Sequence, residues 1–132
     1  MNTIFLPATT STPQVTFDFA SNRLALIVES YPENAAAFYR PLISALEEVI
    51  TMRIITKSPP LLMHITLRYF NSSSTKMLFG MMSALHRGAS AGLSVELHWY
   101  HDPEDDISAE FAEELKLDFP AIHFYLHAEA VS

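Results

Sequence analysis

The chain has 132 residues, of which 49% are hydrophobic and 17% charged, which suits a single domain that folds alone and excludes a disordered chain. The absence of cysteine excludes disulfides, thiolate catalysis, iron–sulfur clusters and cysteine-based zinc sites. The net charge of −7 disfavours nucleic acid as a partner, because proteins that bind its phosphate backbone normally carry an excess of basic residues.

The N-terminal segment has none of the features of an export signal or a membrane anchor. No basic residue precedes Arg23, and the first apolar run, Ile4 to Leu6, stops at Pro7. No stretch of the chain approaches the roughly 20 apolar residues that span a bilayer. We therefore expect a cytoplasmic protein without membrane insertion.

Apolar and polar side chains alternate in two short runs near the N-terminus, with the period of two that is typical of strands. The apolar positions are Val15, Phe17 and Phe19 in the first run and Leu24, Leu26 and Val28 in the second. Residues 20–22 lie between the runs and suit a turn. The pattern predicts a β-hairpin.

Helical and strand patterns alternate in the rest of the chain. We expect a helix to begin within residues 30–34, with Pro41 causing a kink or a later start, and to end before Ser58. The elements expected after it are a strand over 61–70, a helix that ends near Arg87-Gly88, a strand over 93–100, a helix over 107–117 and a strand over 121–128.

With the short apolar run Ile4 to Leu6 as a further N-terminal strand, the resulting order is βββαβαβαβ, which is typical of the α/β class. It predicts one domain over residues 1–132, with about three helices and a mixed, mostly parallel sheet that begins with an antiparallel hairpin. The strand over 61–70 is rich in apolar and β-branched residues, so we expect it to be central and covered on both faces.

Four consecutive hydroxyl residues lie between that strand and the next helix, in the segment Asn71-Ser72-Ser73-Ser74-Thr75-Lys76. Backbone N–H groups at a helix start favour an anion, so a phosphate could be bound or attached there. The alternative is a simple helix N-cap, which needs only one serine. The three glycines, Gly80, Gly88 and Gly92, form no phosphate-binding loop, so a separate kinase would have to supply the phosphate.

Two other groups of polar residues are weaker candidates. The histidines lack a metal-binding motif, so we expect them to be scattered and no metal or other cofactor to be bound; they are His64, His86, His98, His101, His123 and His127. The acidic residues Asp102, Glu104, Asp105, Asp106, Glu110, Glu113 and Glu114 suit a helix start with a solvated face, or a surface that docks a basic partner. Catalysis by paired carboxylates is disfavoured.

Methionines and aromatic residues could form an adaptable binding surface, because methionine side chains repack easily. Met77 and Met81 recur at helical spacing, which favours the core instead. Tyr39 and Phe79 are the better candidates for exposed side chains.

Four segments together resemble the SiaC family of bacterial regulatory phosphoproteins, and the similarity spans nearly the whole chain. The segments are Thr10-Ser11-Thr12-Pro13, Ser30-Tyr31-Pro32-Glu33-Asn34, Tyr69-Phe70-Asn71-Ser72-Ser73-Ser74-Thr75-Lys76 and Trp99-Tyr100-His101-Asp102-Pro103-Glu104. The family is similar in architecture to STAS-domain anti-sigma factor antagonists, in which a hydroxyl at the same kind of junction is phosphorylated.

The resemblance implies a switch without enzymatic activity of its own. A dedicated kinase would phosphorylate the junction, a PPM-type phosphatase would remove the phosphate, and the unmodified form would activate a diguanylate cyclase, with effects on cyclic di-GMP and biofilm formation. The family's acceptor is a threonine directly after the asparagine, and Ser72 occupies that position here as a candidate phosphoserine. Ser73, Ser74 and Thr75 are the less favoured acceptors.

The surface expected to dock partners around Ser72 comprises Tyr69, Asn71, Ser73, Ser74 and Lys76. Two other functions stay open at this point. One is an antagonist that sequesters an anti-sigma kinase. The other is a small enzyme or ligand-binding α/β domain that uses His101 and Asp102 in a pocket at the same edge.

Overall fold

The computed structural model describes residues 4–7, 9, 12, 14–19, 21, 23–27, 35–56, 60–66 and 72–128. Its elements in chain order are β1 (Ile4–Leu6), β2 (Gln14–Asp18), β3 (Arg23–Ile27), α1 (Ala35–Thr56), β4 (Leu61–Thr66), α2 (Ser72–Ser90), β5 (Val95–His101), α3 (Asp106–Asp118) and β6 (His123–Ala128). This order confirms the predicted α/β fold with its three helices. The expected helix start within 30–34 lies outside the described residues, and α1 continues through Pro41.

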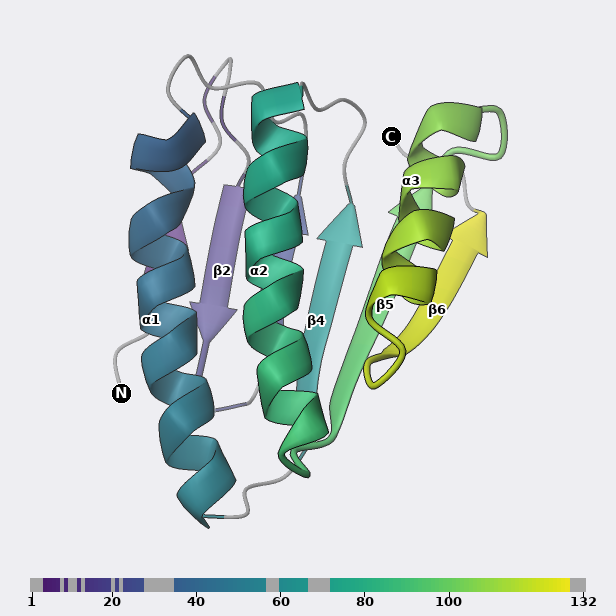
Figure 1. The fold of residues 1–132 in the computed structure, drawn as a ribbon. Coiled ribbons are helices and arrows are strands. Elements are labelled where there is room, and N and C mark those ends of the chain that lie inside the picture. Colours follow the sequence, from purple (N-terminus) through teal and green to yellow (C-terminus); the bar gives the residue numbers. More distant parts are fainter. Residues whose placement is uncertain are drawn as a thin grey trace.

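The six strands form one mixed sheet in sequential order, β1 to β6. The first three strands pair antiparallel, which confirms the predicted hairpin of β2 and β3. The last four pair parallel, and each parallel connection contains one helix. Right-handed crossovers that always move to the next strand in the same direction place their helices on the same face, and Figure 1 shows α1, α2 and α3 together on one side of the sheet.

The expectation that the strand over 61–70 is covered on both faces is therefore wrong. Along β4, Leu61, Met63 and Ile65 are buried, whereas the residues between them are only partly buried. The same alternation runs along β2 and β5. The sheet consequently has a core face under the helices and an open face that none of the described helices covers.

The core lies between the core face and the three helices, and its largest fully buried side chains include Trp99, Tyr39 and Phe17. Tyr39 is 0% exposed, so the expectation that it is an exposed candidate is wrong: its position on α1 points into the core. Met81 is fully buried as expected for a core residue, and Phe79 is partly buried with its ring 5.2 Å from that of Phe119.

Helices α1 and α2 pack closely because α2 has glycine at the contact. A Cβ atom added to Gly88 would lie 2.8 Å from Cγ2 of Ile50 on α1 and 3.2 Å from Cδ2 of Leu93. Cγ2 is attached to the branched Cβ of isoleucine and moves little without the backbone. Gly80, on the same helix, would meet only Cδ1 of Ile43, at an ordinary 3.6 Å.

These two glycines predict opposite effects of the same substitution. Gly80→Ala should raise the free energy of unfolding by up to about 1 kcal/mol, because alanine favours a helix interior over glycine. Gly88→Ala should lower it by about 1–2 kcal/mol, because the new methyl group overpacks the contact with Ile50. Urea denaturation followed by circular dichroism measures both changes. Equal effects of the two substitutions would show that α1 and α2 can move apart at this contact without a loss in the free energy of unfolding.

Candidate functional site

The hydroxyl cluster lies where the sequence predicts, between a strand of the parallel part of the sheet and the start of a helix. β4 ends at Thr66 and α2 begins at Ser72. Tyr69 and Asn71 lie outside the described residues, and of Ser72, Ser73 and Ser74 only the helical backbone is described. The first turn of α2 contains no acidic residue, so no carboxylate of that turn competes for its N–H groups.

Two residues of the cluster have described side chains. Thr75 is partly buried and Lys76 is exposed. A lysine one turn into the helix can approach an anionic group near the helix start, and its exposure leaves it accessible to a protein partner. The geometry of this junction suits a group that carries negative charge, as backbone N–H groups and a nearby ammonium both favour it.

The acidic segment after β5 has a structural role. The carboxylate of Asp105 caps α3 by accepting a hydrogen bond from the backbone N–H of Ser108 at 3.0 Å. The hydroxyl of Ser108 in turn accepts a hydrogen bond of 2.9 Å from Nε1 of Trp99, in the core. Asp102 accepts a bond of 2.9 Å from the backbone N–H of Glu104. These bonds fix the loop between β5 and α3 and account for two acidic side chains, Asp102 and Asp105, that the sequence alone left open to docking.

Neither of the two described cavities includes His101 or Asp102 among its lining residues. His101 is buried, and its Nδ1 lies 3.0 Å from the carbonyl oxygen of Asp102. The larger described cavity, of about 740 Å³, lies on the outer side of α1 and includes Glu47 and Arg87. The described cavities therefore add no support to the alternative of a small enzyme with a site at His101.

Three histidines are not scattered, in contrast to the expectation: they gather with two tyrosines on the open face. We call these five side chains the ring cluster: His64 on β4, His98 and Tyr100 on β5, and Tyr125 and His127 on β6. The parallel register pairs His64 with His98, 34 positions apart in the chain, and His98 with Tyr125. The signal in the sequence was the period-two spacing of these residues within each strand, but register was needed to join them.

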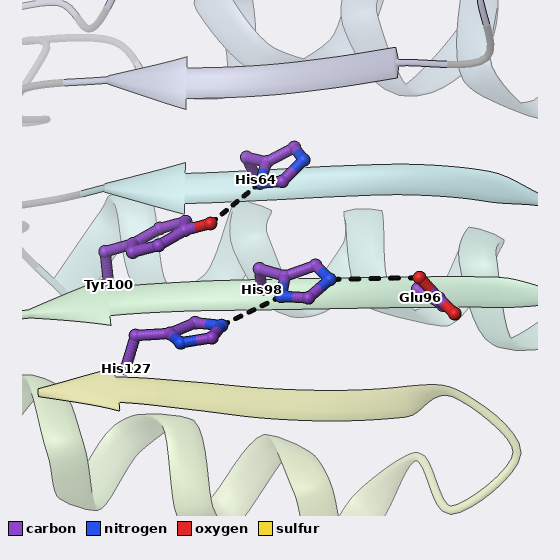
Figure 2. Close-up of polar contacts among 5 residues, drawn as sticks. All are labelled: His64, Glu96, His98, Tyr100 and His127. Atoms are coloured by element: carbon purple, nitrogen blue, oxygen red, sulfur yellow. Dashed lines mark hydrogen bonds and ion pairs between the residues drawn. The ribbon is translucent and has the colours of Figure 1, made fainter.

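Two hydrogen bonds each join a pair of side chains within the ring cluster, as Figure 2 shows. Nδ1 of His98 lies 2.8 Å from Nε2 of His127, and Nδ1 of His64 lies 3.1 Å from the hydroxyl oxygen of Tyr100. Nε2 of His98 is 3.8 Å from a carboxylate oxygen of Glu96. Among the residues that the structure describes, no three histidine or carboxylate side chains are arranged to hold a metal ion.

The environment of His64 disfavours its protonated form. Partial burial lowers the pKa of His64 below the ordinary value of 6.5. The positive charges of His98, Arg23 and His127 lower this pKa further. His64 therefore stays neutral to a lower pH than a histidine in the unfolded chain.

Comparison with known proteins gives a consistent result over nearly the full length. Residues 6–129 match the sequence profile of the SiaC family regulatory phosphoproteins, a description of a regulator rather than an enzyme, as the sequence predicts. An uncharacterized protein of Pseudomonas aeruginosa (strain UCBPP-PA14) is 30% identical over 118 residues, which are 89% of this chain and 90% of that protein.

Solved structures with the same fold include two of SiaC from Pseudomonas aeruginosa. Apo-SiaC is 30% identical with a TM-score of 0.87, over 97% of this chain and 100% of that one. A crystal structure of the diguanylate cyclase SiaD in complex with its activator SiaC matches with 29% identity and a TM-score of 0.86, over 96% of this chain and 99% of the other. No helix within the described ranges is long and apolar enough to cross a membrane.

The lowered pKa of His64 predicts how stability depends on pH. Well above pH 6.5, the ordinary pKa of histidine, His64 is neutral in both the folded and the unfolded state and contributes no pH dependence. Below that pH the unfolded chain binds the proton first, so the free energy of unfolding falls until the pH passes the lower folded pKa. In urea denaturation, the free energy of unfolding should therefore fall less between about pH 7.5 and about pH 5.5 for His64→Gln than for the protein without a substitution.

The control is His123→Gln, which changes an exposed histidine at the start of β6. It should leave the pH dependence of the unmodified protein almost unchanged. The same slope in the His64 variant as in the unmodified protein would contradict the assignment of a depressed pKa to His64.

Proposed function

Because the chain belongs to the SiaC family of regulatory phosphoproteins, we propose that it is a phosphorylation-controlled switch whose unmodified form binds and activates a diguanylate cyclase. The observation that carries this proposal is the similarity of 96% of this chain to one chain in the crystal structure of the diguanylate cyclase SiaD in complex with its activator SiaC. A fold shared at a TM-score of 0.86 gives this chain the same arrangement of elements for contact with such a partner.

The acceptor in this proposal is Ser72, with Ser73, Ser74 and Thr75 as less favoured acceptors. Two features support it. Ser72 is the first residue of α2, so a phosphate on it would meet the positive end of the helix dipole, and the first turn adds no carboxylate to repel it. Lys76 follows one turn later and is exposed.

Phosphorylation would change binding through charge. A phosphate adds about −1.5 to −2 charges and three strong acceptor oxygens at pH 7. The helix start stabilises this charge in the free protein. A docked partner would have to remove the hydrating water of the phosphate; its docking surface comprises Tyr69, Asn71, Ser73, Ser74 and Lys76. The modified form is then the stable free state, and the unmodified form is the one that binds the cyclase.

A separate kinase and a PPM-type phosphatase set the balance between the two forms in this proposal. The three glycines of the chain form no phosphate-binding loop, which is why the phosphoryl group has to come from another protein. The phosphoryl donor and the GTP that a diguanylate cyclase consumes are cytoplasmic, so we assign the switch to the cytoplasm. Its output is cyclic di-GMP, with biofilm formation downstream.

Substitutions at Ser72 test the switch. Ser72→Asp should weaken binding to the cognate diguanylate cyclase at least tenfold in calorimetry, about 1.4 kcal/mol, because it places a permanent negative charge on the docking surface. Ser72→Ala should bind like the unmodified protein and should lose labelling by the cognate kinase in intact-mass spectrometry. Loss of cyclase activation should accompany the loss of binding.

The control variant is Ser83→Asp, which adds the same charge to an exposed position on the same helix and should bind normally. Binding of Ser72→Asp at full strength would refute Ser72 as the switch. Full labelling of Ser72→Ala would move the acceptor to a neighbouring hydroxyl. Capture of an anti-sigma kinase in place of a cyclase from the source cells would favour the antagonist alternative.

A further inference from the structure

The open face presents a row of residues that changes in character from one edge of the sheet to the other. The register across all six strands aligns Phe5, Thr16, Ala25, His64, His98 and Tyr125. The second half of this row belongs to the ring cluster, whereas Thr16 and Ala25 are small. A series of stacked rings therefore adjoins the small side chains of β2 and β3.

The rings are nearly parallel, and most neighbouring pairs overlap as offset stacks, whereas His98 and His127 meet through their edges. His98 and His127 are inclined by only 17°, and their centroids are 5.1 Å apart. That separation is the sum of the 2.8 Å hydrogen bond between their nitrogens and the two ring radii, so the bond lies in the ring planes. His64 and His98 are inclined by 14°, and Tyr100 and His127 by 16°. Among the described rings, this stack ends on the β3 side at His64, whose register neighbour there is the small Ala25.

A cavity of about 450 Å³ lies beside the ring cluster, and His64 belongs to both the cavity and the cluster. Its other lining residues include Thr16, Ala25, Asp18, Ser21 and Arg23. The volume falls within the usual range of small-molecule sites, and the polar groups gather at one end, where the register pairs Asp18 with Arg23. Arg23 is exposed and lies roughly 7 Å along β3 from Ala25.

We propose that this cavity and the adjoining ring cluster form a binding site for a nucleotide. The base lies against the ring of His64 over Ala25, the phosphate binds the guanidinium of Arg23, and ribose hydroxyls donate hydrogen bonds to the carboxylate of Asp18. Aromatic rings bind nucleobases by stacking, and arginine binds phosphate through paired N–H groups. The overall charge of −7 disfavours a long nucleic acid as the ligand. A free nucleotide is therefore the ligand that we propose.

This site lies on the open face, so it is separate from the hydroxyl cluster at the start of α2 and does not depend on the proposed switch. Its probes are GMP, guanosine and inorganic phosphate. In an NMR titration, GMP should shift the amide signals of Thr16, Ala25, His64 and His98. Guanosine should bind at least tenfold more weakly, and inorganic phosphate alone should shift none of these signals.

Paired variants separate the contributions to binding. Arg23→Gln should weaken GMP binding at least fivefold while leaving guanosine binding unchanged, because it removes only the phosphate contact. His64→Leu should weaken both ligands, and His64→Phe should restore guanosine binding because it keeps a ring face. Arg40→Gln is the matched control, since Arg40 is exposed on α1, on the other side of the sheet.

The proposal is overturned if millimolar GMP leaves the open-face amides unshifted in the correctly folded protein, or if Arg40→Gln weakens GMP binding as much as Arg23→Gln does. It is equally overturned if the purified cyclase shifts these amides and GMP does not, which would assign the open face to a protein partner. Retained amide dispersion in the His64→Phe variant serves as the check on folding.

Discussion

Each parallel connection in this protein runs from a strand to its immediate neighbour, and this constraint places all three helices on one face of the sheet. The strands must then be apolar on one side only, and their alternation of buried and partly buried residues follows from it. The helix starts fall at the carboxyl ends of the strands, as Figure 1 shows for β4 and α2. The junction at Ser72 and the ring cluster are both consequences of this arrangement.

The order of elements was predictable because the relevant signals are local. The period of two along β2 and β3, the proline-rich breaks and the basic, glycine-containing end of α2 are each contained within about ten residues. The burial of β4 was predicted wrongly, because Leu61–Ile65 contains only one polar side chain, His64. So short an apolar segment has the same sequence pattern whether one face of the strand is covered or both are. Tyr39 was predicted wrongly for a similar reason. Helical spacing identifies the apolar face of α1, but packing against the sheet decides which aromatic side chains are buried.

The candidate site could be predicted in part. The sequence places a hydroxyl cluster at a helix start, since the strand pattern, the serines and the helical spacing are contiguous. It does not choose among neighbouring hydroxyls, which have the same chemistry and lie within one turn. The ring cluster could not be predicted in the same way, because His64, His98 and His127 meet only through the register of three strands, and register is a property of the folded sheet.

Because the sheet has two different faces, substitutions at alternate residues of a strand have different consequences during evolution. A change at Leu97 or Trp99 disturbs packing against the helices, whereas a change at His98 between them alters only what the outer surface can recognise. New chemistry can therefore be acquired on alternate residues without repacking the interior. A regulator built this way can diversify the signals it senses while its scaffold stays the same.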